Sequence, residues 1–321
     1  MPELVSIDDV RAAAKRLSGI AVRTPLVPWP RPDDRDIAIK PESLQPTGAF
    51  KLRGAYNAIA SLTDEERAAG VVTHSSGNHG RAVAWAARAF GVRACVVVPD
   101  SAPTVKVDGI RAFGGEVVPV PVAERLARVE AIAAESGATV VPPYEHPAVI
   151  AGQGTVGLEI AEDAPDVAAV LVPVSGGGLI SGIALAIAAT CPEAKVIGVE
   201  PELAADAAES LAAGERVAWD EERTGRTAAD GLRVPVVGEL TWQHIRAYVH
   251  DVLTVTEDEI TATVRDLALG ARLVAEPSGA VAPAAAIYRS VELPAGKIVA
   301  VLSGGNASPD ALAQAIDGDR R

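Results

Sequence analysis

Short runs of apolar, mostly β-branched residues alternate along this chain with alanine-rich segments of helical length. The strand candidates cover residues 70–73, 94–98, 116–120, 139–141, 170–174, 196–199, 252–255 and 298–302. The helix candidates cover residues 80–90, 104–113, 123–135, 179–189 and 257–271. Most of the strands are apolar on both faces, which is typical of a parallel sheet covered by helices on both sides. The alternation predicts an α/β fold with right-handed crossovers.

Loops of two kinds interrupt this pattern. Residues 28–36 and 212–237 are predicted to be irregular, and the second segment is long enough to expect a functional role. Four shorter loops are glycine-rich or polar: PTGAFK at 46–51, SSGNHG at 75–80, SGGG at 175–178 and SGGN at 303–306. Three of these four directly follow a predicted strand. Ligands in open α/β sheets bind beyond the carboxyl ends of the strands, so we expect a site there.

The composition is that of a globular protein. Hydrophobic residues make up 49% and charged residues 22% of the 321 residues, a length that suggests about two domains. The net charge of −13 argues against a nucleic-acid or anionic-membrane partner, since both need a basic surface. No apolar run reaches the roughly 18 residues of a membrane span. Residues 1–16 carry charges throughout, unlike a signal peptide.

Cysteine and histidine usage narrows the chemistry further. Cys95 and Cys191 lie in apolar surroundings, and we expect both to be buried and reduced, as in a cytoplasmic protein. The five histidines form no HExxH motif and no cluster with cysteine, so a zinc enzyme is not expected.

Lysine is scarce: the 29 basic residues comprise 6 Lys and 23 Arg. Chemistry that needs an amine therefore has six candidates, and Lys51 stands closely behind a Thr-Gly turn in an apolar stretch. A lysine is usually a surface residue. If Lys51 is instead partly desolvated, its pKa falls and its amine becomes a nucleophile. The sequence leaves these two alternatives open.

The run VLVPVSGGGLIS, residues 170–181, is the strongest local signal. A buried strand runs into Gly176, Gly177 and Gly178 and then into an apolar helix, which is the form of a backbone cradle for phosphate. Without a GKS/T motif it is not a nucleoside-triphosphate loop. A tight strand–helix turn remains possible. So does a dinucleotide fingerprint, in which Gly182 completes the glycine spacing and Glu200 binds ribose.

The SSGNHG loop places hydroxyl, amide and imidazole groups ahead of a helix. Ser75 or Ser76 is suited to cap that helix. The segment is more polar than a cap requires, so its donors are also suited to a carboxylate or phenolic oxygen. Ser303 offers one neutral hydroxyl after the last strand, where a simple turn is the alternative.

Together these loops resemble those of fold-type II pyridoxal-phosphate enzymes, and most of all the serine/threonine dehydratase and serine racemase branch. The resemblance covers nearly the whole chain in order: KPESLQPTGAFKLRGA, SSGNHGRAVAWAA, HPAVIAGQGTVGLEI, VPVSGGGLISGIA, GVEPELAADA, TAADGL, VTEDEI, EPSGAVAPAA and VLSGGN. It implies two open, twisted, mostly parallel sheets flanked by helices, as in the tryptophan synthase β-subunit. A small mobile domain of residues 70–145 would be inserted into a large domain of residues 1–69 plus 146–321. It also suggests a homodimer.

The resemblance assigns a role to each matching position. Lys51 would form a Schiff base with pyridoxal 5′-phosphate and, when freed, remove the substrate Cα proton. The other residues assigned to the cofactor are Phe50 beside Lys51, Asn78 at the ring 3′-oxygen, Ser175, Gly176, Gly177, Gly178 and Leu179 at the phosphate, and Ser303 at the pyridine nitrogen. Those assigned to the substrate carboxylate are Ser75, Ser76, Gly77 and His79. Ser76 would also face Lys51 across the ring as a second catalytic group.

By the same resemblance, Glu200, the carbonyl of Ala204 and Asp206 would bind Mg²⁺ or Ca²⁺, and their oxygen ligands suit a hard cation. A solvated acidic loop is the alternative. The implied reaction is β-elimination from a hydroxyamino acid such as threonine, serine or 3-hydroxyaspartate, giving a 2-oxo acid and ammonia. Racemisation would use the same site, with Ser76 returning the proton.

Two positions depart from the family pattern. Ala49 replaces a common serine before the lysine, and Tyr144 stands where racemase-like members often have asparagine. We expect Tyr144 to lie near the substrate, which favours the dehydratase. The more distant alternative is a dinucleotide-binding oxidoreductase.

Overall fold

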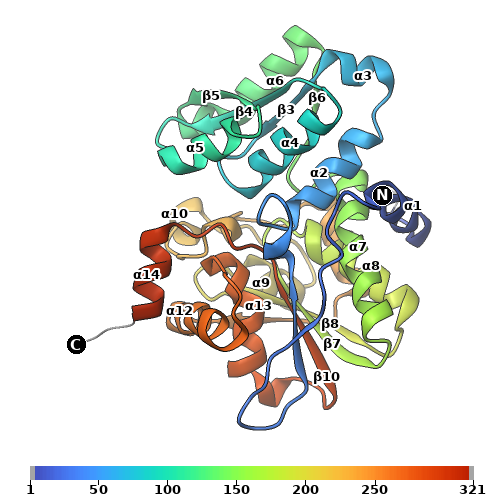
Figure 1. The fold of residues 1–321 in the computed structure, drawn as a ribbon, viewed down its shortest axis with the longest axis vertical. Coiled ribbons are helices and arrows are strands. Elements are labelled where there is room, and N and C mark those ends of the chain that lie inside the picture. Colours follow the sequence, from blue (N-terminus) through green and yellow to red (C-terminus); the bar gives the residue numbers. More distant parts are fainter. Residues whose placement is uncertain (1–3, 318–321) are drawn as a thin grey trace.

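The computed structural model in Figure 1 describes residues 4–317 and contains two sheets. The larger has the strand order β1-β2-β10-β7-β8-β9 and the smaller β5-β4-β3-β6. Every neighbouring pair is parallel except β1 with β2. The strands are β1 Val27–Pro28, β2 Ile37–Pro41, β3 Val71–His74, β4 Ala94–Pro99, β5 Glu116–Val120, β6 Thr139–Val140, β7 Val167–Pro173, β8 Lys195–Pro201, β9 Asp251–Val255 and β10 Lys297–Leu302. The expected fold, with two mostly parallel sheets, is confirmed.

Helices cover both sheets. The α-helices are α1 Ile7–Leu17, α2 Lys51–Ala60, α3 Asp64–Ala69, α4 Asn78–Ala89, α5 Thr104–Arg111, α6 Arg125–Ser136, α7 Pro147–Asp163, α8 Gly178–Thr190, α9 Asp206–Ala213, α10 Glu221–Thr224, α11 Glu239–Tyr248, α12 Glu257–Asp266, α13 Pro277–Tyr288 and α14 Pro309–Asp317. Short 3₁₀ segments are η1 Glu42–Leu44, η2 Val122–Glu124, η3 Asp230–Leu232 and η5 Ser290–Glu292, and η4 Leu267–Ala271 is a π-helix.

The large sheet is buried on both faces, which is why its strands read as continuous apolar runs. Along β7, Ala169 and Leu171 belong to the core shared with α12 and α13. Val170 and Val172 point to the opposite face and belong to the core shared with α7, α8 and α11. Alternation of side chains between two covered faces requires apolar residues at every position.

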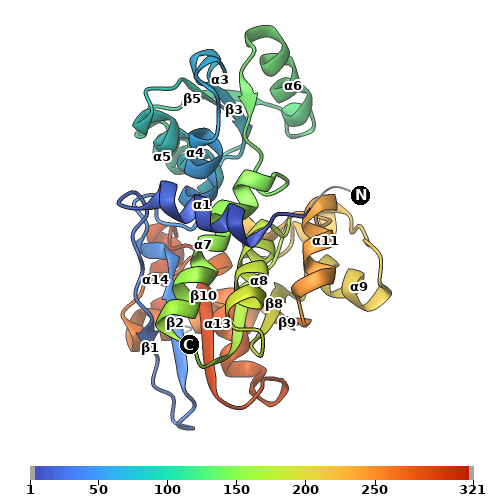
Figure 2. The same cartoon turned by 90° about the vertical axis from the view of Figure 1, so that its right-hand side faces the viewer.

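The small sheet has its own helical layers, α4 and α5 on one face and α6 on the other. In both Figure 1 and Figure 2 the small sheet forms one end of the molecule, and α1 lies at the level where the two parts meet. Figure 1 shows α2 at the same level. Helix α2 contributes Ala55, Ala58 and Ile59 to the core beneath the small sheet. It also packs against α7, where Gln153 accepts a hydrogen bond from the Gly54 N–H at 3.2 Å. Helix α2 is therefore held by both parts.

All eight predicted strands are confirmed to within a few residues, but β1 and β2 were not predicted. The inner strand β2 was not predicted because Lys40 interrupts its apolar pattern. Its amine is fully buried and bonds Glu159 at 2.6 Å and the Thr24 carbonyl at 2.6 Å. The predicted loop 28–36 is confirmed beyond Pro28, which lies in β1.

Two other expectations need correction. The helix expected over 257–271 is α-helical only to Asp266, because the chain continues as a π-helix to Ala271 and then leaves at Arg272 with φ +60°. Segment 212–237 is largely irregular but contains α10 and η3.

Cys95 and Cys191 are buried free thiols, as expected. Within residues 4–317 no helix is long and apolar enough to cross a membrane.

Candidate active site

The four loops singled out in the sequence converge at one end of the large sheet. Ser175 follows β7 and Ser303 follows β10, so both lie at carboxyl ends of strands. The Ser303 carbonyl accepts a hydrogen bond from the Phe50 N–H at 3.0 Å, and Ala49 forms an antiparallel bridge with Gly304. The segment that carries Lys51 is thereby attached to the loop after the last strand.

Lys51 is the first residue of α2. Its Nζ donates to the Pro143 carbonyl at 2.7 Å and lies 5.0 Å from the centre of the Phe50 ring. Desolvation lowers the pKa of Lys51 to about 8, because a low-dielectric environment disfavours the ammonium form. Lys51 is half-buried and not a surface lysine, so the structure favours the alternative of a partly desolvated amine.

The glycine loop has no room for side chains. Gly177 has φ +89°, and a Cβ on it would meet Thr241 Oγ1 at 2.8 Å. A Cβ on Gly176 would lie 2.4 Å from Cδ1 of Tyr144, so this ring packs on the loop next to Pro143. Thr241 donates its hydroxyl to the Gly176 carbonyl at 2.7 Å. The Gly176 carbonyl is therefore already hydrogen-bonded within the protein.

The backbone N–H groups at the end of the glycine loop belong to the first turn of α8. The first N–H groups of a helix have no intrahelical acceptor, and the helix dipole favours an anion there. Gly178 begins α8, and Ser175 just before it accepts a long hydrogen bond from the Val234 N–H at 3.4 Å. These features fit a bound phosphate group.

The SSGNHG loop enters α4 without the serine cap that the sequence suggested. Gly77 is the N-cap residue and makes no side-chain capping bond. Ser75 instead accepts from the Gly77 N–H within the loop at 3.2 Å. Asn78 becomes the first residue of α4, and its side chain extends toward the loop after β10, where its Oδ1 accepts from Asn306 at 2.7 Å.

His79 is buried, and the neighbouring groups determine its tautomer. Nε2 lies 2.9 Å from the Val141 carbonyl, which only accepts, so Nε2 carries the proton. Nδ1 has no partner, and burial together with the Lys51 charge lowers the pKa of His79 to about 3. The ring offers a lone pair and no free N–H, so a contact from His79 to a carboxylate falls to its backbone.

Ser303 is buried at 4% exposure and keeps a neutral hydroxyl in the site. Its Oγ donates a long hydrogen bond to the Ser278 carbonyl at 3.4 Å. No charged group is supplied at this position.

Glu200, Ala204 and Asp206 are each 1% exposed, so the solvated acidic loop is wrong. Glu200 accepts from the N–H groups of Ala207 at 3.1 Å and Ala208 at 2.8 Å, at the start of α9. Neither carboxylate oxygen of Asp206 has a hydrogen-bond partner. Burial and mutual repulsion raise the pKa of Glu200, and burial raises that of Asp206 to about 7. Residues 4–317 contain no group of three or more His, Cys, Asp or Glu side chains arranged for a metal.

The same geometry excludes the dinucleotide-binding alternative. Glu200 is engaged by backbone donors and is closed to a ribose. Gly182 is a packing residue, because a Cβ there would lie 2.3 Å from the Ile150 carbonyl in the contact between α7 and α8.

Two polar residues of the site received no role from the sequence, Glu276 and Asn306. Both contact Asn78. Glu276 belongs to the EPSG run and Asn306 to the SGGN run. Nothing in the residue types of these two runs indicates that both would contact Asn78.

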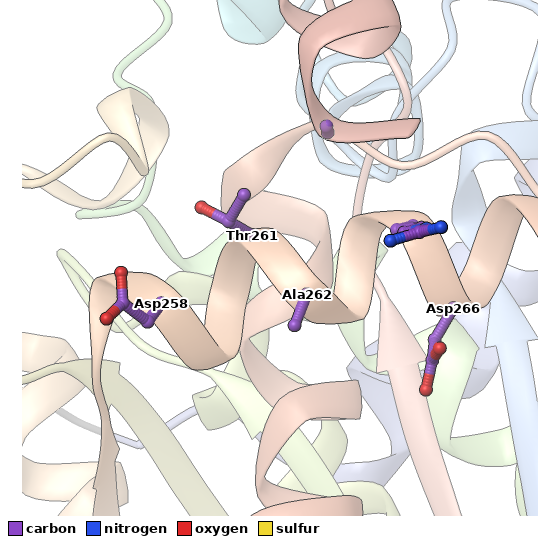
Figure 3. Close-up of a pocket in the computed structure, with 6 residues that line it drawn as sticks. Asp258, Thr261, Ala262 and Asp266 are labelled. Atoms are coloured by element: carbon purple, nitrogen blue, oxygen red, sulfur yellow. The ribbon is translucent and has the colours of Figure 1, made fainter. Parts of the chain in front are cut away.

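A separate surface pocket lies between α12 and α14 (Figure 3). It is lined by Asp258, Thr261, Ala262, Arg265, Asp266 and Ala315. None of the predicted site residues lines it, and we assign it no part in the chemistry.

A desolvated amine, a glycine loop at a helix N-terminus and a neutral hydroxyl at a strand end define an α/β enzyme built to hold a phosphorylated cofactor. The chain belongs to the family of pyridoxal-phosphate dependent enzymes, whose family model matches residues 17–304. The chain is 40% identical to an L-threonine ammonia-lyase of Thermotoga maritima, over 98% of this chain and 79% of that protein. It is 38% identical to an L-threo-3-hydroxyaspartate ammonia-lyase of Saccharomyces cerevisiae, over 97% and 96%. The structure of maize serine racemase matches with TM-score 0.91 and 36% identity, over 98% of both chains.

Proposed function

We propose that this chain is a pyridoxal-phosphate-dependent ammonia-lyase, a dehydratase that catalyses β-elimination from a hydroxyamino acid to give a 2-oxo acid and ammonia. Threonine and serine are the proposed substrates, with 3-hydroxyaspartate as a further candidate. The observation that carries this proposal is the desolvated Lys51 amine, which bonds Pro143 next to the Tyr144 ring that packs on the glycine loop. The similarity to lyases named for threonine and 3-hydroxyaspartate supports it.

The residues present fit this cofactor. Lys51 would hold its aldehyde carbon, with Phe50 beside the amine. The N–H groups of the loop Ser175, Gly176, Gly177, Gly178 and Leu179 would bind its phosphate. Asn78 would donate to the ring oxygen, and the Ser303 hydroxyl would face the ring nitrogen. When bound, pyridoxal phosphate supplies an electron-withdrawing ring that stabilises negative charge at the substrate Cα.

Residues of the chain itself would remove the substrate proton and bind the substrate carboxylate. Lys51 would remove the Cα proton, a role that suits an amine whose pKa lies near 8, because a large fraction is unprotonated in mildly alkaline solution. The loop of Ser75, Ser76, Gly77 and the His79 backbone would bind the substrate carboxylate.

Amino-acid racemisation is the second candidate function, supported by the similarity to maize serine racemase. Ser76 would be the group that returns a proton to the opposite face of Cα. Both reactions begin with removal of the same proton, so the fate of the β-hydroxyl group decides between them.

Reduction with borohydride tests the cofactor assignment. Purified protein should be yellow, and borohydride should bleach it and leave the cofactor mass on the peptide that contains Lys51. Lys51→Ala should abolish this labelling, whereas Lys195→Ala, a change at an exposed lysine, should not. Labelling that persists in Lys51→Ala would refute the assignment.

A substrate panel separates the two reactions. We expect 2-oxo acid to form from L-threonine, L-serine or L-threo-3-hydroxyaspartate faster than the D-enantiomer appears. Ser76→Ala should remove racemisation and spare most of the elimination. Faster production of the D-enantiomer by the wild-type protein would make the racemase the main function.

We also propose that Glu200, Asp206 and the Ala204 carbonyl bind Mg²⁺ or Ca²⁺. The buried, unpartnered carboxylate of Asp206 supports this, since a divalent cation would relieve its repulsion with Glu200. The cation should raise the melting temperature of the wild-type protein and of Glu202→Gln, an exposed change in the same loop. Asp206→Asn should raise the melting temperature without cation and abolish the further increase. An equal increase in Asp206→Asn would contradict the site.

We further propose that the small sheet with its helices, residues 70–145, forms a mobile domain inserted into residues 1–69 plus 146–321. Domain motion of this kind closes many active sites.

The protein would act as a homodimer in the cytoplasm. The buried free thiols are consistent with a reducing compartment.

A further inference from the structure

The orientation of the Asn78 amide follows from a chain of hydrogen bonds that begins at Thr47. The Thr47 carbonyl can only accept, and it lies 2.9 Å from the side-chain nitrogen of Asn306. That nitrogen is therefore a donor, and it also donates to Asn78 at 2.7 Å. The atom of Asn78 that faces Asn306 must then be its oxygen. The amide nitrogen of Asn78 is directed elsewhere, and its assignment rests on contacts and not on an arbitrary choice between two similar atoms.

The nitrogen of Asn78 donates to Glu276. Nδ2 lies 2.5 Å from Oε1 of Glu276, which is 7% exposed and stands just before α13. A side-chain amide has two N–H groups. One is taken by Glu276, so the second is left for a ligand.

Two glycines make space for this network. A Cβ on Gly304 would lie 2.2 Å from the Glu276 carboxylate and 3.2 Å from the Asn78 nitrogen. Gly48 has φ +76°, and a Cβ on it would lie 2.3 Å from Asn306. Glycine at these positions is what lets Glu276 and Asn306 approach Asn78 from two sides.

We propose that Glu276 is a positioning residue for the cofactor: it holds the Asn78 amide so that the remaining N–H of Asn78 is available to the ring oxygen of pyridoxal phosphate. This inference rests on the proposed function, because it takes Asn78 as a cofactor contact. If the Glu276 contact is lost, the nitrogen of Asn78 loses its acceptor and the donor geometry is no longer held from both sides.

The charge state of Glu276 should change near neutral pH. Burial raises the pKa of Glu276 to about 7, and Asp230 near η3 acts in the same direction. The hydrogen bond from Asn78 opposes this, as do Lys106 on α5 and Arg81 on α4. Above this pKa the carboxylate is charged and accepts more strongly from Asn78, because hydrogen bonds to ionised acceptors are the stronger ones. Cofactor binding should therefore tighten as pH rises through about 7.

Two substitutions separate positioning from simple packing. Glu276→Gln keeps an oxygen acceptor for Asn78 but cannot ionise, so cofactor affinity should stay within about threefold while the pH step near 7 disappears. Glu276→Leu removes the acceptor, and affinity should fall by roughly ten- to a hundredfold. Asn306→Ala should weaken binding in the same direction. Glu292→Gln, at an exposed carboxylate, is the matched control and should behave as wild type.

The measurement is titration of each apoprotein with pyridoxal 5′-phosphate between pH 6 and 9, followed by the visible absorption of the bound cofactor, with no substrate present. Lys51 should contribute a pH step of its own in every variant, so the difference between the profiles of wild type and Glu276→Gln reports Glu276. Wild-type affinity in Glu276→Leu, or an unchanged pH profile in Glu276→Gln, would overturn the inference while the proposed function stands. Failure of the wild-type protein to bind the cofactor through Lys51 would instead refute the proposed function. If Glu276→Leu does not fold, the profile of Glu276→Gln decides.

Discussion

Two lysines of this protein have lowered pKa values, and their partners separate their roles. Burial lowers the pKa of Lys40, but Glu159 lies 2.6 Å from its amine and opposes the shift. Lys51 donates only to a backbone carbonyl, and desolvation is the cause of its shift. A buried ammonium paired with a carboxylate is structural, whereas a desolvated amine without one is prepared to lose its proton.

The pKa of Lys51 predicts the pH dependence of cofactor uptake. Only the unprotonated amine attacks an aldehyde, so the initial rate of incorporation into apoprotein should rise with pH and level off above about 8. Stopped-flow absorption between pH 6.5 and 9.5 measures this rate, with Lys195→Ala as control. A rate that keeps rising up to pH 9.5 without levelling off would show that the amine is not desolvated in solution.

At the scale of elements, helix α2 is held in place by a buried ion network close to the reactive lysine. Arg53 bonds Glu42 at 2.8 Å and Glu159 at 2.7 Å, and Arg53 and Glu42 are almost fully inaccessible. Although burial alone would raise it, the pKa of Glu42 is lowered by Arg53. Arg53 and Glu42 therefore both stay charged. Through Arg53, the first turn of α2 is attached to η1 and to α7.

Removal of Arg53 should be costly because it leaves Glu42 buried without its main partner. We expect Arg53→Met to lower the free energy of unfolding by about 3–5 kcal/mol. Arg11→Met, which removes an exposed pair with Asp8 on α1, should change it by less than about 1 kcal/mol. Urea unfolding of the two variants provides the measurement. A loss below about 1 kcal/mol for Arg53→Met would mean that the network does not support α2.

At the scale of the whole molecule, an ion pair joins the two parts outside their cores. Lys106 on α5, beside the small sheet, contacts Asp230 at η3, which packs near α13 under the large sheet. Both side chains are partly exposed, so the pair should contribute little to global stability. Its position suggests that it restrains relative motion of the two parts.

Lys106→Met should therefore loosen α5 and η3 without unfolding the protein. We expect faster amide hydrogen exchange in these two segments, with the free energy of unfolding within about 1 kcal/mol of wild type. Exchange followed by mass spectrometry locates the effect, and Lys15→Met on α1 is the control. Unchanged exchange in both segments would exclude a restraining role for the pair.

Most of the architecture could be predicted from residue pattern because burial on both sheet faces demands apolar residues throughout, as along β7. The exception is β2, because a buried Lys40 is compatible with a strand inside the sheet only when Glu159, distant in the sequence, neutralises it. Pattern along the chain does not contain that pairing.

The sequence by itself determined the α/β class and the glycine loop at a helix start, since both depend on neighbouring residues. The order of the motifs along the chain determined the family. Only the tertiary structure decided that Lys51 is desolvated, that Glu200 is buried at the start of α9, and that the Asn78 amide faces Glu276. Asn78 and Glu276 are 198 positions apart. The pKa of a side chain and the direction of its hydrogen bonds depend on which groups surround it, and those groups are brought together only by folding.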